Sequence, residues 1–120
     1  MNTLRNEVQL IGNLGRDVEF KELSNGAHLA KFTMATNEFY KNKKGEKVQE
    51  TTWHNIVAWG KLAELMNVHL EKGIEVAIKG KIVNANYEDK NGNTVYRTEI
   101  KASDFIKMDK KEPMPFDMVV

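Results

Sequence analysis

Residues 50–66 read ETTWHNIVAWGKLAELM, a strand-like run that passes directly into an amphipathic, helix-like segment. Side chains alternate between the two faces of a strand, so Trp53 and Trp59 share one face and His54 lies on the other. Tryptophans at this spacing are roughly 20 Å apart at a rise of about 3.3 Å per residue. That separation suits contact with two units of a polymer, although a single tryptophan in a strand more often fills a core.

The composition predicts one small domain. The chain has 120 residues and a formal net charge of +1, a size that allows a single core. It contains no cysteine, which excludes disulfides, thiolate metal sites and cysteine nucleophiles and suits the cytoplasm. No apolar run reaches membrane-spanning length, and the segment MNTLRNEVQLIGN has the pattern of folded structure rather than of a signal peptide.

The spacing of apolar residues gives the order of elements. It predicts strands around residues 8–11 and 29–40, followed by the strand that carries both tryptophans. Helical spacing predicts one helix over residues 61–72, ended by Gly73, and a second hairpin follows over residues 77–105. Three strands, a helix and two strands are the layout of an OB-fold. We therefore predict an all-β protein with one helix, a five-stranded Greek-key barrel of the kind that binds oligonucleotides or oligosaccharides.

The pattern contains no catalytic or metal-binding constellation. His28, His54 and His69 each lie in a different predicted element and lack metal-ligand spacing. The glycines have no phosphate-binding context, and no serine or threonine stands in a nucleophile motif. We expect no enzyme activity, no metal and no cofactor. The barrel is expected over residues 1–107 and a short flexible tail over residues 108–120.

Aromatic residues and lysines instead gather on the predicted hairpins. Proteins hold single-stranded nucleic acid with little sequence preference by stacking bases on rings, at roughly 1–3 kcal/mol per base, beside a positive groove. The predicted stacking residues are Tyr40, Trp53, Trp59 and Tyr87, and the predicted phosphate contacts are Lys41, Lys43, Lys61, Lys72, Lys79 and Lys81. Phe32, Phe39 and Phe105 are expected in the core or at an edge contact.

Over residues 5–107 the sequence closely resembles the bacterial single-stranded DNA-binding protein family. The matching segments are NEVQLIGNLGRDVEF, SNGAHLAKFTMATNE, TTWHNIVAWGKLAE, LEKGIEVAIKGKI and YEDKNGNTVYRTEI. The resemblance implies an OB-fold, a homotetramer, and cytoplasmic binding of single-stranded DNA in replication, recombination and repair. It also places base-stacking residues at Tyr40, Trp53, Trp59 and Tyr87, and phosphate-contacting residues at Lys41, Lys43, Lys61 and Lys72.

Two expectations concern assembly. A small barrel leaves strand edges exposed, and pairing of edges between copies is a common remedy, so we expect Val8 and Leu10 of the first strand at an oligomer interface. The resemblance adds His54, at a position important for subunit association in the family. In the family an acidic tip ending in Pro-Phe recruits genome-maintenance proteins. Pro115 and Phe116 are the corresponding residues here, although they are not terminal.

The sequence departs from the family where basic residues are common, at Asn55 and at residues 83–86, which read VNAN. These departures and the short tail leave open an interaction module of the primosomal type, whose main task is to assemble proteins. An RNA-binding OB-fold is a third alternative. A secreted sugar-binding OB-fold is disfavoured by the absence of a signal peptide and of disulfides. Trp53 and Trp59 favour retained contact with DNA.

Overall fold

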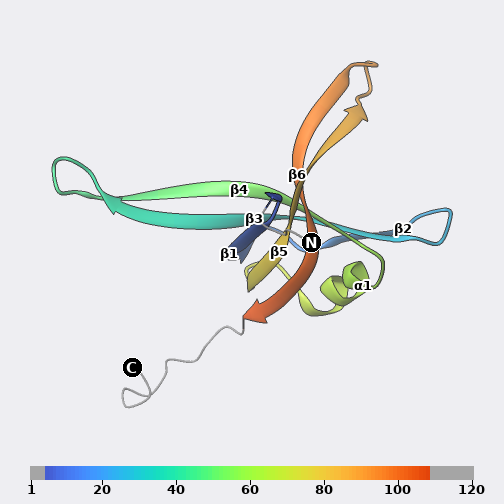
Figure 1. Ribbon diagram of the computed structural model, residues 1–120, viewed down its shortest axis with the longest axis horizontal. Helices are drawn as coiled ribbons and strands as arrows, with labels where there is room; N and C mark the ends of the chain where they lie inside the picture. The colour runs from blue at the N-terminus through green and yellow to red at the C-terminus, as the bar shows by residue number, and fades with distance from the viewer. Residues whose placement is uncertain (1–4, 109–120) are drawn as a thin grey trace, which may run out of the picture.

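The computed structural model describes residues 5–108, which form one curled sheet with a single helix beside it (Figure 1). The elements, in chain order, are β1 (Val8–Leu14), β2 (Glu19–Glu22), β3 (His28–Lys41), β4 (Lys47–Trp59), α1 (Gly60–His69), β5 (Glu75–Glu88) and β6 (Thr94–Met108). The strand order is β1-β5-β6-β4-β3-β2, and an additional β1–β3 pairing closes five strands into a barrel that leaves β2 outside. The predicted five-stranded barrel is confirmed, and β2 is an extra strand paired with β3.

Closure of the barrel depends on a change of partner within β1. This strand pairs with β5 from Val8 to Asn13, and Asn13 also pairs with Ala35 of β3. A Cβ atom on Gly12 would lie 2.1 Å from the carbonyl oxygen of Ala35. A side chain at Gly12 would therefore push β1 away from β3, which explains the glycine at this point of the barrel.

Two hairpins extend beyond the barrel as arms (Figure 1). β3 and β4 pair without interruption from Leu29 and Trp59 to Lys41 and Lys47, and we call residues 36–52 the β3–β4 arm. β5 and β6 pair along their whole lengths and project in a different direction. Between the arms, β4 and β6 are joined by a short parallel pairing, so the two projecting hairpins share one junction.

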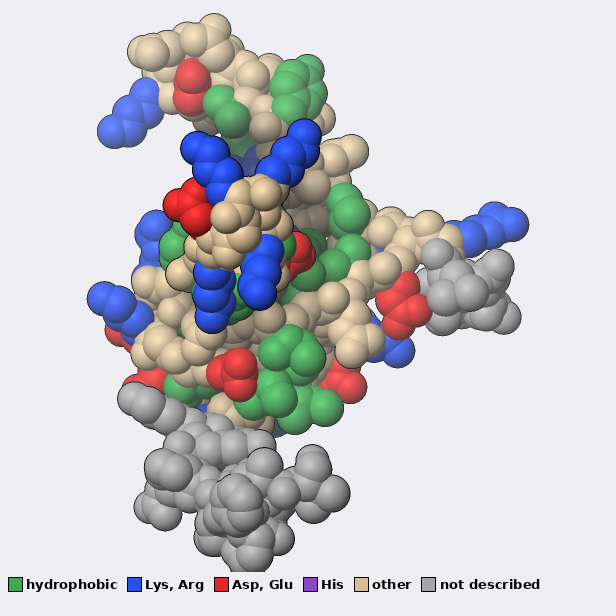
Figure 2. All heavy atoms as spheres, turned by 90° about the vertical axis from the view of Figure 1, so that its left-hand side faces the viewer, with side chains coloured by type: hydrophobic (Ala, Val, Ile, Leu, Met, Phe, Trp, Pro, Cys, Tyr) green, Lys and Arg blue, Asp and Glu red, His purple; other side chains and the backbone are tan. Residues whose placement is uncertain are grey.

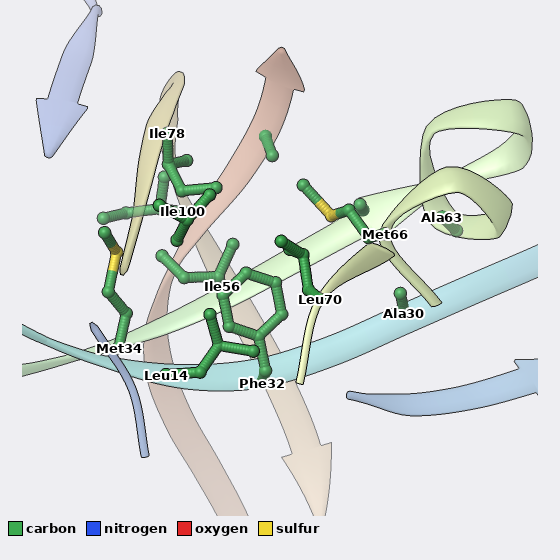
Figure 3. Packing of buried hydrophobic residues seen from close by; sticks show 13 residues of the cluster. Leu14, Ala30, Phe32, Met34, Ile56, Ala63, Met66, Leu70, Ile78 and Ile100 are labelled. Carbon is green, nitrogen blue, oxygen red and sulfur yellow. The ribbon is translucent and has the colours of Figure 1, made fainter. Parts of the chain in front are cut away.

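The apolar core draws on the five barrel strands and the helix (Figure 3). Its largest fully buried side chains are Met34, Ile56, Met66, Val76 and Ile78. Phe32 is buried among them and Phe105 packs against the cluster, as predicted. The prediction for Phe39 is wrong, because this side chain is 58% exposed on the β3–β4 arm. The arm extends beyond the barrel, where no core remains to receive the ring.

The helix is shorter than predicted. Residues 61–72 were expected to be helical, but α1 ends at His69, and Leu70 takes an extended conformation with φ −107° and ψ 142°. Leu70 thereby buries its side chain in the core beside Met66 (Figure 3). Gly73, with φ +88°, lies in the turn that follows rather than at the helix end. Among residues 5–108, no helix is long and apolar enough to cross a membrane.

Candidate nucleic-acid interface

Both tryptophans of β4 lie at the surface. Trp53 is 61% exposed and Trp59 is 44% exposed, and the register places them opposite Ala35 and Leu29 of β3. Residues directly opposite in an antiparallel pair point to the same side of the sheet. The two rings therefore stand on one outer face of the β3–β4 sheet, and the alternative that they fill the core is wrong.

Trp53 rests against the chain that leaves β1. A Cβ atom on Gly15 would lie 2.5 Å from Cζ3 of Trp53 and 3.0 Å from Oγ1 of Thr33. The missing side chain at Gly15 is thus what allows the indole to lie close to this segment. Arg16, the next residue, joins Gly15, Thr33 and Trp53 in lining a shallow hollow. A guanidinium and a broad exposed ring are therefore neighbours at this end of the face.

A second hollow lies between the β3–β4 sheet and the β5–β6 hairpin. Its lining includes three cationic side chains, Arg16, Lys31 and Arg97, and two carboxylates, Glu19 and Glu99. Lys31 comes from the middle of β3, whereas Arg97 and Glu99 come from β6. This hollow follows the same face of β3 and β4 that carries the tryptophans, because its lining also includes Thr33 and Asn55, which pair with each other.

Tyr87 is held in place at the edge of this hollow. Its hydroxyl donates a hydrogen bond of 2.6 Å to Oε2 of Glu99 and accepts one of 3.3 Å from Nζ of Lys31. The Lys31 ammonium also lies 4.9 Å from the centroid of the Tyr87 ring, and Cζ of Arg97 lies 5.7 Å from it. Glu99 is only 5% exposed. The buried carboxylate therefore fixes the ring, while the ring brings two cations together.

The four lysines predicted beyond the arm do not line this hollow. Lys79 forms an ion pair of 3.2 Å with Glu7, in a part of β5 that pairs with β1. Lys81 lies directly across from Lys101 of β6. Lys61 and Lys72 are exposed at the two ends of the helical segment. Their assignment as phosphate contacts remains a prediction.

Three cations of the hollow were missed by the sequence reasoning. Arg16 follows a glycine in a loop, and Lys31 and Arg97 stand 66 residues apart in strands that are not sequence neighbours. Of the three, only Lys31 could have been placed from the sequence, because alternation along β3 points it to the face opposite the buried Phe32. The packing of the β5–β6 hairpin over β3, which brings Arg97 to Lys31 through Tyr87, has no local signature in the sequence.

The lysine-rich end of the β3–β4 arm is exposed on all sides. Figure 2 looks onto this end, where basic side chains gather around the hairpin. The lysines of this part of the sequence are Lys41, Lys43, Lys44 and Lys47. Tyr40 is 50% exposed and pairs with Val48. By the alternation of β3, Tyr40 faces away from the side of the sheet that carries Trp53. The structure thus places the predicted arm residues outside the hollow.

The residues predicted at an oligomer interface differ in orientation. Val8 and Leu10 are half-buried and pack against the core, whereas Ile11 of the same strand is 50% exposed. Contacts made by this strand would therefore use its edge and Ile11 rather than the two predicted side chains. Nε2 of His54 lies 3.0 Å from Oγ1 of Thr36, so this ring is hydrogen-bonded within the sheet.

The predicted partner-docking site is not tested by the structure. Pro115 and Phe116, the predicted partner-docking residues, lie outside the described residues, as does the tail from residue 109 onward. Within residues 5–108, no group of three or more histidine or carboxylate side chains is arranged to hold a metal ion.

Comparison with known proteins gives consistent matches. A single-stranded DNA-binding protein 1 of Chlorobaculum tepidum is 41% identical over 108 residues, which cover 89% of this chain and 67% of that protein. One of the same name from Xylella fastidiosa is 37% identical over 108 residues, covering 89% and 79%. A solved Plasmodium falciparum SSB complex with ssDNA superposes with a TM-score of 0.78 at 32% identity, covering 87% of this chain and 95% of that one.

A further solved structure supports the fold alone. The single-stranded DNA-binding protein of Thermus aquaticus, in a deletion mutant, superposes with a TM-score of 0.77 at 19% identity, covering 88% of this chain and 51% of that one. The profile of the Single-strand binding protein family matches residues 5–108, which include the whole barrel, both arms and the face that carries the tryptophans. This chain is a member of the Single-strand binding protein family.

Proposed function

We propose that this protein binds single-stranded DNA with little sequence specificity, and protects it during replication, recombination and repair. One observation carries the proposal: exposed rings at Trp53 and Trp59 and the fixed ring of Tyr87 surround a hollow lined by Arg16, Lys31 and Arg97. Flat rings offer every base a stacking surface, and the cations attract the phosphates. The relatives named for single-stranded DNA binding support the same assignment.

The geometry favours an unpaired strand over a duplex. The rings of Trp53 and Trp59 rise from a sheet face and stack only on bases whose own faces are free, which a duplex does not offer. Glu99 and Glu19 place negative charge beside the three cations, so the hollow is less positive than its basic residues alone suggest. Base stacking is therefore expected to contribute a large share of the affinity.

The test is a titration of intrinsic tryptophan fluorescence at fixed salt with oligo-dT, oligo-rU and duplex of equal length. We expect quenching and tight binding with oligo-dT and weak binding with duplex. Trp53→Ala and Trp59→Ala should each cost about 1–3 kcal/mol of binding, while Tyr96→Ala, which removes a 75% exposed ring on the opposite side of the β5–β6 hairpin, serves as the control. Unchanged affinity in both tryptophan variants would contradict the proposal, and stronger binding of oligo-rU would reassign the substrate to RNA.

We also propose that the protein works in the cytoplasm as a homotetramer, with β1 and the His54 face at subunit contacts. Within the described residues, β1 pairs with β3 only at Asn13 and Leu14, so most of that edge of β1 is unpaired. Ile11 of the same strand is also exposed. Light scattering at micromolar concentration should give the mass of four chains of 13.7 kDa each. His54→Lys should lower that mass without unfolding the barrel. A single-chain mass for the unmodified protein would overturn this part of the proposal.

A further inference from the structure

The hollow between the β3–β4 sheet and the β5–β6 hairpin contains its own counter-charges. Glu19 and Glu99 line it together with three cationic side chains, so these groups leave one net positive charge. A surface that binds phosphates gains affinity from each cation and loses affinity to each carboxylate, which repels the ligand. The two carboxylates therefore weaken the attraction of any polyanion to the hollow.

Glu19 stands beside two lysines. It pairs directly with Lys31 in the β2–β3 ladder, and residues paired in this way have their Cβ atoms about 5 Å apart on one side of the sheet. Oε1 of Glu19 also lies 3.6 Å from Nζ of Lys21, and both of these side chains are more than half exposed. Exposed ion pairs contribute little to stability. The effect of Glu19 is therefore on the charge at the rim of the hollow rather than on the fold.

Glu99 compensates the cations from the other side of the hollow. Its carboxylate is buried and is connected to Lys31 through the hydroxyl of Tyr87, by hydrogen bonds of 2.6 Å and 3.3 Å. Arg97 lies two residues earlier on the same face of β6, about 7 Å away along the strand. Water and salt screen a buried charge less than an exposed one. Lys31 thus lies between a carboxylate of β2 and a carboxylate of β6.

We propose that Glu19 and Glu99 determine the preference of this surface for a single strand over a duplex. The inference rests on the proposed binding of single-stranded DNA and names the residues that exclude the competing ligand. A duplex carries one charge per about 1.7 Å of its axis, whereas one strand alone carries one per about 3.4 Å. A carboxylate therefore repels a duplex about twice as strongly as a single strand. Only the single strand offsets this repulsion by stacking its bases on the exposed rings.

The experiment measures the affinity of Glu19→Gln for oligo-dT and for duplex of equal length at one salt concentration. Removal of one charge about 6 Å from a phosphate, in a water-like dielectric, changes affinity about threefold. With twice the charge density in the duplex, we expect about threefold tighter binding of oligo-dT and about tenfold tighter binding of duplex. The ratio of the two affinities should therefore fall about threefold. A ratio at or above the wild-type value would overturn the proposal.

Glu22→Gln is the matched control. Glu22 belongs to the same short strand, where alternation directs it to the face opposite Glu19. It forms an ion pair of 3.7 Å with His28 and does not line the hollow. This variant loses the same formal charge, so its affinity ratio should stay at the wild-type value. A fall equal to that of Glu19→Gln would assign the effect to the total charge of the protein and would also overturn the proposal.

Glu99→Gln tests the buried carboxylate. Glutamine keeps an oxygen that can accept the hydrogen bond from the Tyr87 hydroxyl, so the ring retains its partner while the charge is lost. The affinity ratio should fall at least as far as in Glu19→Gln, and an unchanged ratio would overturn the assignment of Glu99. If Glu99→Gln does not fold, the exposed Glu19 still decides the proposal. Absence of wild-type binding to oligo-dT would instead overturn the proposed function, so the two failures are distinguishable.

Discussion

Replacing Tyr87 with Phe removes one hydroxyl from the hollow and leaves the ring in place. That hydroxyl is the donor of the 2.6 Å hydrogen bond to Glu99, whose carboxylate is nearly inaccessible to water. Hydrogen bonds to charged groups contribute about 1.5–3 kcal/mol, and a buried acceptor that loses its donor cannot be compensated by solvent. We therefore expect Tyr87→Phe to lower the free energy of unfolding by about 2 kcal/mol.

Urea unfolding at one fixed protein concentration measures this loss, because the stability of an oligomer depends on the concentration of its chains. With a slope of roughly 1–3 kcal/mol per molar urea, the midpoint should fall by about 1 M. Tyr96→Phe is the matched control, since Tyr96 is exposed on the opposite face of the same hairpin. Its midpoint should stay at the wild-type value.

A double-mutant cycle with Glu99→Met separates the hydrogen bond from other effects of the substitution. Without the carboxylate, Tyr87→Phe has no buried acceptor to leave unpaired, so its cost should fall below about 0.5 kcal/mol. The reasoning is refuted if Tyr87→Phe costs the same in both backgrounds or costs nothing in either. Oligo-dT binding is a second measurement. Tyr87→Ala should lower the free energy of binding by about 1–3 kcal/mol, and Tyr87→Phe, which keeps the ring, should lower it less.

Three further predictions concern the barrel and the binding face. Gly12→Ala should destabilise the fold by about 1–3 kcal/mol in urea unfolding, because its methyl group would meet the backbone oxygen of Ala35; wild-type stability would show that the strands can separate freely. Gly15→Ala should reduce the free energy of oligo-dT binding more than the free energy of unfolding, since its methyl group displaces the ring of Trp53. A loss of stability with unchanged oligo-dT affinity would contradict this. Arg97→Ala should reduce the slope of log K against log salt by about 0.7 if it contacts one phosphate, and an unchanged slope would exclude that contact.

Local alternation predicted the parts of the structure that depend on one strand. It placed Trp53 and Trp59 on one face and Phe32 in the core, and the structure confirms both. It could not predict where a strand runs beyond the barrel. Phe39 was expected in the core or at an edge because of its hydrophobicity, yet alternation along β3 places it on the outer face with Ala35, away from Phe32. The length of the β3–β4 hairpin also carries it past the last buried position of β3, Ala35.

The helix end and the cations of the hollow depend on contacts between distant segments. The apolar spacing continues through Leu70, so periodicity alone extends the helix, whereas the core takes up Leu70 from an extended backbone. Lys31 and Arg97 meet around Tyr87 because three strands from different parts of the chain converge. Such a cluster is encoded by the pairing of strands, and no single stretch of sequence reports it.

The absence of any buried side chain in residues 36–55 has a kinetic consequence. The backbone hydrogen bonds of the β3–β4 arm are not tied to the core, so the arm can open and close while the barrel remains intact. Its amide protons should exchange with solvent far faster than those of Ile56 or Ile78, and they should slow when a ligand holds the arm closed. The same chain would then contain a barrel that stays ordered and an arm whose order varies with occupancy, and hydrogen exchange measured residue by residue would distinguish the two.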